Sequence, residues 1–298
     1  MPSLGSSQLE LRASEAGADP NARIGIFDSG VGGITVLREL YRHLPAESVL
    51  YFADTARLPY GTRSQAEIVQ FAREILHWMV AQHVKIAIMA CNTCSALALE
   101  VVRHEFDIPI LSPIAPASQA AVAQGGRIGT IATPATAASN AYKRAIHAID
   151  SSASVWQVGC PEFVPLVEQN RITDPYAYRI AQQYLAPLQA RGINTLIYGC
   201  THYPHLAPVL QAILAPQVRT IDPAHHVVAL AERELAQRNL KSTHPAQPTR
   251  FCVSGSPQQF AQLSRQWLGC IPQVERVDLA ATRPVPFPSA SGAKSAAE

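Results

Sequence analysis

The sequence predicts an α/β protein with two pseudo-symmetric, mostly parallel α/β sandwich domains and an active site in the cleft between them. Three observations predict this fold class. Short apolar runs alternate with amphipathic segments, the runs show no polar–apolar alternation of their own, and two sequence features recur in the same order at similar intervals. Strands that are apolar on both faces and separated by helices are typical of parallel sheets.

The predicted elements follow one another along most of the chain. Apolar runs of strand length are expected to form strands at 24–27, 49–52, 86–90, 108–111, 128–132, 155–158, 195–198, 219–221 and 251–253. Amphipathic segments are expected to form helices at 32–44, 64–82, 94–106, 114–124, 136–149, 174–191, 204–214, 224–238 and 256–268. This order places a helix between most successive strands, as parallel pairing requires.

An internal repeat predicts the division into two units. "RIGIFDSGVGG" begins at Arg23 and "RIGTIATPAT" begins at Arg127, 104 residues later, while Cys91 and Cys200 are 109 residues apart. Each cysteine follows an apolar run, and ligands of open α/β sheets bind at the carboxyl ends of strands. Two facing units would therefore bring the two thiols to opposite walls of one cleft.

The repeat also indicates domain boundaries. One α/β domain is expected to hold 23–115 together with the returning segment 224–282, and the other to hold 116–223. The N-terminal extension 1–22 and the tail 283–298, which is rich in Pro, Ser and Ala, are expected to be disordered.

Composition excludes several classes of protein. The 298 residues are 48% hydrophobic and 15% charged, which is typical of a compact globular protein rather than a disordered one. The net charge of +2 without a basic cluster argues against nucleic acid or an acidic membrane surface as a partner. The first residues lack the apolar core of a secretory signal, and six cysteines are too few for a disulfide scaffold of this size. We therefore expect a cytoplasmic protein with free thiols.

Two of these thiols are candidates for chemistry. Cys91 in "MACNTCS" and Cys200 in "YGCTHYP" share their position after a strand and their polar neighbours, whereas Cys94, Cys160, Cys252 and Cys270 are expected to be small buried hydrophobes. A free thiol has a pKa of about 8.5, which a helix N-terminus is expected to lower. One thiolate can remove a proton from carbon while a thiol on the opposite face delivers another. The result would be inversion of a stereocentre.

Two ionisable residues are placed to assist the thiols. Asp28 ends the first predicted strand and His202 follows Cys200 by two residues. Either could exchange a proton as a thiol changes charge, and the alternatives are a turn residue for Asp28 and a core histidine for His202. The surrounding loop "DSGVGG" (28–33) does not fit a dinucleotide site, because Thr35 stands where a third glycine belongs and Asp28 would repel a phosphate.

Several motifs together resemble glutamate racemase, within the wider aspartate/glutamate racemase superfamily. They are "IGIFDSGVGGITVLREL", "YFADTARLPYGTRS", "ACNTCSALALE", "CPEFVPLVE" and "GCTHYP", and the resemblance runs from about Arg23 to Asp278. It implies cofactor-independent interconversion of L- and D-glutamate that supplies D-glutamate for peptidoglycan. It also implies no metal. His202 favours the glutamate branch, because relatives in the wider superfamily often carry Glu there.

The resemblance also implies a role for each of the candidate residues. Cys91 is expected to deprotonate D-glutamate and Cys200 to deprotonate L-glutamate, with Asp28 assisting the former and His202 the latter. Asp54 and Glu168 match two further acidic positions that influence catalysis in the family. Substrate contacts are expected from Asp28, Ser29, Pro59, Tyr60, Gly61, Asn92, Thr93, Thr136, Thr201 and His202. Their hydroxyl, amide and backbone N–H groups suit carboxylates.

Some questions stay open at this point. Ala135 replaces a glycine that is usual in the loop carrying Thr136, and Cys94 replaces a more usual alanine. An aspartate or hydantoin racemase and an arylmalonate decarboxylase are alternatives in the same superfamily. A zinc protein that uses Cys91, Cys200 and His202 is another, although the compact ligand spacing of structural zinc sites is missing. Regulation by a cell-wall precursor and assembly as a homodimer are partner predictions that the residues leave undecided.

Overall fold

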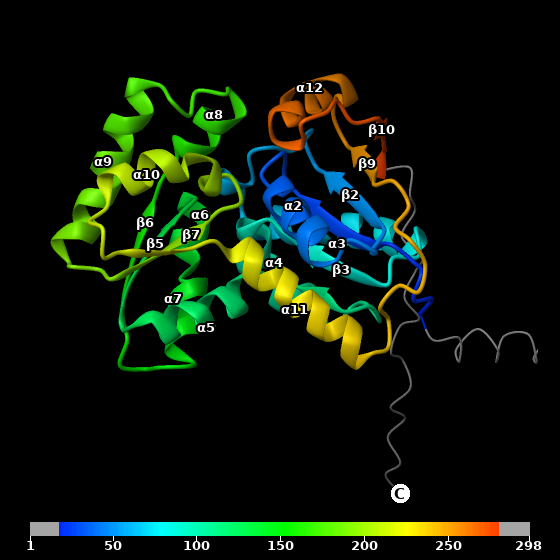
Figure 1. Cartoon of the computed structure of the whole chain (residues 1–298), viewed down its shortest axis with the longest axis horizontal. Helices are drawn as coiled ribbons and strands as arrows, with labels where there is room; N and C mark the ends of the chain where they lie inside the picture. The colour runs from blue at the N-terminus through cyan, green and yellow to red at the C-terminus, as the bar shows by residue number, and fades with distance from the viewer. Residues whose placement is uncertain (1–17, 280–298) are drawn as a thin grey trace, which may run out of the picture.

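A computed structural model describes residues 18–279 as two lobes, each built on its own sheet (Figure 1). All strand pairs in both sheets are parallel, with helices on both faces. This confirms the predicted fold class. The predicted disordered tail 283–298 lies outside the described residues, as does 1–17 of the extension. Residues 18–22 of the extension are described, and the Asn21 side chain accepts a hydrogen bond from the backbone N–H of Thr243.

The first sheet has the strand order β10-β9-β2-β1-β3-β4. Its strands are β1 (Ile24–Asp28), β2 (Val49–Ala53), β3 (Ile86–Met89), β4 (Ile110–Leu111), β9 (Arg250–Val253) and β10 (Val274–Arg276). Every residue of β1, β2 and β3 is buried, which explains their uninterrupted apolar sequence. The edge strand β10 was not predicted, because its three residues are partly exposed and form no apolar run.

Helices cover both faces of the first sheet. Its elements are α2 (Ile34–His43), η1 (Tyr60–Thr62), α3 (Gln65–Ala81), α4 (Asn92–Val102), α11 (Pro223–Gln237) and α12 (Pro257–Leu268). Leu37 of α2 and Val227 of α11 belong to one hydrophobic cluster, and Ile75 of α3 and Ala98 of α4 belong to the cluster on the other face. The segment that returns from the second lobe thus completes the core of the first.

The second sheet has the strand order β6-β5-β7-β8. Its strands are β5 (Arg127–Ala132), β6 (Ser154–Gly159), β7 (Thr195–Gly199) and β8 (Arg219–Ile221). The helices of this lobe are α5 (Ile114–Gln124), α6 (Pro134–Ser139), α7 (Ala141–His147), α8 (Phe163–Glu168), α9 (Pro175–Ala190), η2 (Tyr203–Leu206) and α10 (Ala207–Ile213). Two clusters again sandwich the sheet, one under α5 and α7 and one under α8, α9 and α10.

Two helical predictions were wrong in detail. The helix predicted at 136–149 is two helices, because Asn140 adopts a left-handed conformation with φ of 56° between α6 and α7. Asparagine tolerates this conformation better than most residues, so it can end one helix and begin the next. The helix α8 was not predicted, since its six residues are too few to show a helical period.

The repeat seen in the sequence is a repeat of strand order. The order β2-β1-β3-β4 in the first sheet corresponds to β6-β5-β7-β8 in the second. Ile24 pairs with Ile86 at the start of β1 and β3, and Ile128 pairs with Thr195 in β5 and β7. Cys91 lies just after β3 and Cys200 just after β7, so the two thiols occupy equivalent places in the two lobes. The domain boundaries themselves stay a prediction.

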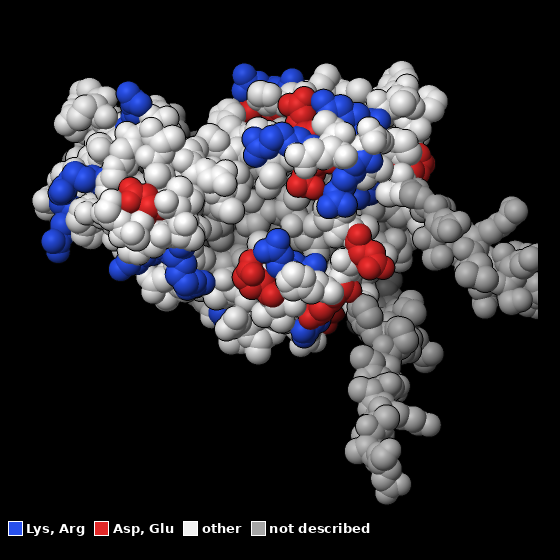
Figure 2. Space-filling model, turned by 90° about the horizontal axis from the view of Figure 1, so that it is seen from below, with Lys and Arg blue, Asp and Glu red and all other residues white. Residues whose placement is uncertain are grey.

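Hydropathy and charge bear on which partners the described residues could have. Within 18–279 no helix combines the length and the apolar character that a membrane span needs. On the face seen in Figure 2, positive and negative side chains are interspersed among uncharged ones. Lys85 directly precedes β3 and forms a buried ion pair with Glu47. It therefore lies at the opposite end of β3 from Cys91.

Candidate functional site

A cavity of about 180 Å³ lies between the two lobes. A cavity of this size suits a small metabolite. Most of the candidate residues line it, namely Ser29, Pro59, Tyr60, Gly61, Cys91, Asn92, Thr93, Cys200, Thr201 and His202. The structure therefore brings together residues that are up to 173 positions apart in the sequence.

The two thiols are almost equally enclosed in this cavity. Cys91 and Cys200 are each 6% exposed. Cys91 is the N-cap residue of α4, and backbone N–H groups of that helix favour its thiolate. Burial nevertheless raises the pKa of Cys91, and the negative charge of Asp28 raises it further. The expectation of a lowered pKa was therefore wrong for Cys91, because loss of water outweighs the helix terminus.

Asp28 lies behind the cavity wall rather than in it. Its carboxylate accepts hydrogen bonds from the Gly30 backbone N–H at 3.1 Å and from the Thr201 hydroxyl at 3.1 Å. Thr201 belongs to the second lobe, so this bond crosses between the lobes. Burial raises the pKa of Asp28, and the charge of His202 and the hydrogen bonds offset only part of that rise.

His202 connects Cys200 to Glu168. Its Nδ1 atom is 3.7 Å from Cys200 Sγ, and its Nε2 atom is 2.7 Å from Glu168 Oε1. Burial lowers the pKa of His202, but the hydrogen bonds and negative charges of Cys200 and Glu168 raise it well above its usual value. Glu168 does not line the cavity. Its carboxylate contacts the imidazole ring of His202 instead.

The glycines of the 28–33 loop allow it to approach this group closely. A Cβ atom on Gly32 would lie 2.4 Å from Thr201 Oγ1 and 2.5 Å from His202 Nδ1. A Cβ atom on Gly30 would lie 2.8 Å from Glu168 Oε1. These residues are therefore glycine because the loop packs against the other lobe, and no phosphate is needed to explain them.

Three threonine hydroxyls link the lobes at another wall of the cavity. Thr93 Oγ1 is 2.8 Å from Thr133 Oγ1 and 3.1 Å from Thr136 Oγ1, and the last two are 2.9 Å apart. Thr93 belongs to α4, whereas Thr133 caps α6 in the second lobe. Thr136 does not line the cavity as expected, and Thr133 does. The Thr-Pro pair at 133–134, a common helix start, is the signal that could have identified it.

Two buried side chains hold cavity residues in place. The Tyr142 hydroxyl donates to Asn92 Oδ1 at 2.6 Å, which leaves the Asn92 amide N–H groups to donate elsewhere. The Tyr60 hydroxyl donates to Asp54, which also accepts from Arg57 Nε at 2.6 Å and from Ser254 Oγ at 2.7 Å. Asp54 is thus behind the wall and fixes Tyr60.

The sequence did not indicate part of the lining. The residues that it missed are Leu58, Thr62, Thr133, Pro134, Cys160, Pro161, Val164 and Pro165. Cys160 is fully buried, as expected of a small hydrophobe, yet it also contributes to the cavity wall. The same expectation was wrong for Cys270, which is exposed. The place of Cys160 after β6, in the same edge of the sheet as Cys200, is a signal that could have been read.

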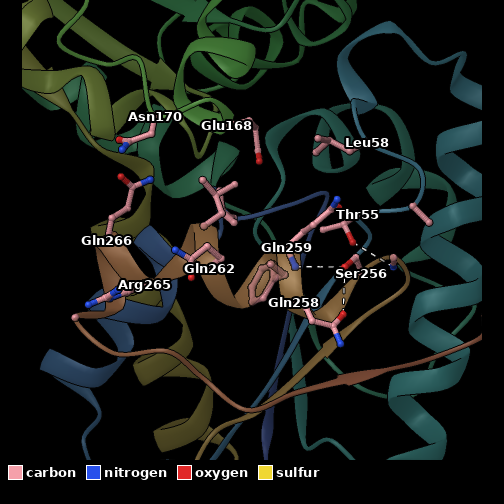
Figure 3. A pocket seen from close by; sticks show the side chains of 16 residues that line it. Thr55, Leu58, Glu168, Asn170, Ser256, Gln258, Gln259, Gln262, Arg265 and Gln266 are labelled. Atoms are coloured by element: carbon pink, nitrogen blue, oxygen red, sulfur yellow. Dashed lines mark hydrogen bonds between the residues drawn. The ribbon is translucent and has the colours of Figure 1, made fainter.

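A larger groove of about 1260 Å³ adjoins the cavity between α8 and α12 (Figure 3). Leu58 lines both spaces, and Glu168 projects into the groove from the second lobe. Polar side chains of α12, among them Gln259 and Gln262, form the opposite wall. The carboxylate that contacts His202 is therefore accessible from the groove.

The arrangement brings several groups that can exchange protons to one small cavity. Two repeated α/β lobes that bring Cys91 and Cys200 from equivalent positions to a shared cavity define the class of α/β enzymes that act at a carbon centre by proton transfer. Cys91, Cys200 and His202 do not form a three-ligand group within 4.8 Å in the described chain, which argues against the zinc alternative.

Comparison with known proteins shows to which family the chain belongs. The family model Asp/Glu/Hydantoin racemase matches residues 24–231. A glutamate racemase of Gloeothece citriformis is 66% identical over 256 residues, covering 86% of this chain and 92% of that protein. The glutamate racemase of Francisella tularensis, solved in complex with D-glutamate, has a TM-score of 0.83 and 35% identity over 88% of this chain and 99% of its own. The Escherichia coli enzyme, solved with L-glutamate and the activator UDP-MurNAc-ala, has a TM-score of 0.70 and 25% identity, covering 86% and 98%.

The chain therefore belongs to the Asp/Glu/Hydantoin racemase family, in its glutamate racemase branch. It is an amino-acid racemase, an isomerase. The resemblance to glutamate racemase found in the sequence is confirmed.

Proposed function

We propose that this racemase interconverts L- and D-glutamate by proton transfer between the substrate α-carbon and two thiols, Cys91 and Cys200. One observation carries the proposal: the two thiols lie at equivalent ends of repeated strand pairs and line one cavity. The D-glutamate in the Francisella tularensis structure supports the choice of substrate.

The proposed reaction removes a proton from one face of the α-carbon and delivers a proton to the opposite face. With L-glutamate, the Cys200 thiolate removes the α-proton and the Cys91 thiol donates its proton to the opposite face. The enzyme is left with Cys200 as thiol and Cys91 as thiolate, which is the state that converts D-glutamate to L-glutamate. The two enantiomers have equal free energy, so two bases of matched strength suit both directions.

The neighbouring groups are proposed to manage the charge on each thiol. His202 takes the Cys200 proton at Nδ1, and Glu168 stabilises the imidazolium that results. Asp28 is placed to assist Cys91, whose pKa is raised by burial in the free enzyme. The ammonium group of bound glutamate would bring a positive charge near the thiols and favour their thiolate forms.

The substrate carboxylates are proposed to bind to uncharged donors. Asn92, Thr93 and Thr201 line the cavity from the two lobes, with Ser29 and Thr133 beside them. Hydroxyl, amide and backbone N–H groups bind carboxylates strongly when water is excluded. The hydroxyl groups of Thr93 and Thr133, which bond to each other, would exchange that bond for bonds to a carboxylate.

Exchange of the substrate α-hydrogen tests the proposal. Without added cofactor, the protein should replace the α-hydrogen of L- and of D-glutamate with solvent deuterium, and should act poorly on aspartate. Cys91→Ala and Cys200→Ala should each abolish racemisation, with Cys252→Ala as a matched control. Near-parental racemisation by either cleft variant would refute the two-base assignment. Preference for aspartate or a hydantoin, or release of carbon dioxide from an arylmalonate, would select one of the alternative activities.

The cellular role and partners are further proposals. D-glutamate made by this chain would serve peptidoglycan synthesis in the cytoplasm. Expression of the chain in a bacterium that requires D-glutamate tests this role, and restored growth would support it. The activator in the Escherichia coli structure supports regulation by a cell-wall precursor, and adding UDP-MurNAc-alanine to the racemisation assay tests it. The homodimer expected from the sequence is tested by sedimentation of the protein with and without glutamate.

A further inference from the structure

A second cluster of ionisable side chains lies outside the cavity, between α2 and α11. Glu39 and His43 are one turn apart on α2, and His225 is in the first turn of α11. One ligand atom from each lies within 4.8 Å of the other two. Glu39 Oε2 is 3.4 Å from His43 Nε2 and 2.7 Å from His225 Nδ1. No step of the proposed reaction uses these residues.

One oxygen of the carboxylate at the centre of this cluster has ion-pair contacts with two imidazoles but no hydrogen bond. Glu39 is 9% exposed, and its Oε2 atom is buried with no hydrogen bond. Arg42 takes the other oxygen, Oε1, at 3.0 Å. A buried carboxylate oxygen without a hydrogen bond is costly, and a cation would offset that cost, whether it is a protonated imidazole or a metal ion held by both rings. Both imidazole nitrogens lie close to Oε2, but neither donates a hydrogen bond to it.

We propose that Glu39, His43 and His225 bind a divalent transition-metal ion, with zinc as the best fit. Two imidazoles and one carboxylate are a common protein ligand set for zinc, and water can complete a tetrahedron. Bonds of about 2.0–2.2 Å place neighbouring ligand atoms of a tetrahedron roughly 3.4 Å apart. The contact from Glu39 to His43 already has that length, and the His225 contact must lengthen. His225 and His43 are half-exposed, at 50% and 52%, so both rings are free to turn.

The ion would fasten the returning helix to the first lobe. The α2 helix follows directly from the 28–33 loop beside the cavity, and α11 begins just after Asp222. A small space lined by Thr35, Cys200, Thr201 and Asp222 lies between the start of both helices and the cavity. A metal bridge one turn further along would therefore stabilise the packing of α11 on α2 without contacting substrate.

Metal titration of the untagged, metal-free enzyme tests this site. Zinc should bind with one ion per chain and raise the midpoint of thermal unfolding. His225→Gln and His43→Gln should each weaken zinc binding by more than about tenfold. Each variant removes a direct ligand, and loss of a residue that only hydrogen-bonds to a ligand already weakens metal binding by roughly 10–100-fold. His226→Gln, which changes the adjacent histidine, should leave the affinity unchanged. Racemase activity and far-UV circular dichroism of each variant verify its folding.

Cobalt separates this site from the cavity thiols. Co²⁺ held by imidazole and carboxylate should show weak visible bands without the strong near-ultraviolet thiolate bands. Thiolate bands that vanish in Cys200→Ser would place the ion in the cavity and overturn the proposal. Unchanged zinc affinity in both histidine variants, or no zinc binding by the parent, would overturn it as well. Because these measurements do not depend on racemisation, they stand apart from the test of the two-thiol mechanism.

Discussion

Replacing Glu168 with glutamine tests how the charge on Cys200 is managed. The variant keeps the shape of the side chain and can still accept a hydrogen bond from His202, but it removes the negative charge 2.7 Å from His202 Nε2. A hydrogen bond to a charged group contributes about 1.5–3 kcal/mol. If the imidazolium forms only as Cys200 gives up its proton, this loss lowers kcat/KM by roughly 10- to 150-fold. Glu168 is 18% exposed at its side chain, so the smaller part of that range is expected.

The fall in kcat/KM must be the same for both enantiomers, because their free energies are equal. The isotope effects, in contrast, should differ between directions. Proton transfer at Cys200 becomes the slower step in Glu168→Gln. Because Cys200 removes the α-proton of L-glutamate, the kinetic isotope effect with α-deuterated L-glutamate should rise. The effect with α-deuterated D-glutamate should fall, because its labelled bond is then broken in the faster step.

The assay follows the racemisation of each substrate, with and without α-deuterium, by circular dichroism. Glu100→Gln is a matched control, because Glu100 is highly exposed on α4 and forms an ion pair with Arg103 on the same helix. The His202 ring, followed by NMR, should titrate at a lower pH in the Glu168 variant, since part of the cause of its raised pKa is gone. Unchanged kcat/KM together with an unchanged His202 titration would refute this account of Cys200.

Three further changes probe the walls of the cavity. Gly32→Ala should fold yet lose roughly 10²- to 10⁴-fold in kcat, because the new methyl group displaces the His202 ring; normal activity in the same assay would contradict the close approach. Asp28→Asn should lose activity but resist urea better than the parent at neutral pH. Burial raises the Asp28 pKa, so the protonated carboxyl stabilises the folded state at a pH below its ordinary pKa. This contribution to the free energy of unfolding is lost as the pH rises. The stability advantage of Asp28→Asn over the parent should therefore shrink in acid. Tyr142→Phe should raise KM for glutamate more than it lowers kcat, because the Asn92 amide loses the bond that orients it, and equal KM values would argue against that role.

Local sequence patterns were enough to identify the elements that build the lobes. Apolar runs such as 24–27 became fully buried strands, because a strand between two helical layers has no solvent face to fill with polar residues. The patterns failed where elements are too short for a period to repeat recognisably, as in α8 and β10. They also failed at Asn140, whose left-handed backbone is permitted but not required by its sequence.

The sequence by itself determined the fold class, the repeat and the equivalent positions of Cys91 and Cys200, because these depend on periodicity and on order along the chain. Only the tertiary structure decided how the groups around them behave. Burial set the direction of the Cys91 pKa, and contacts across the lobes joined His202 to Glu168. Desolvation and contact between distant segments depend on how the two lobes close on each other, which no local pattern records.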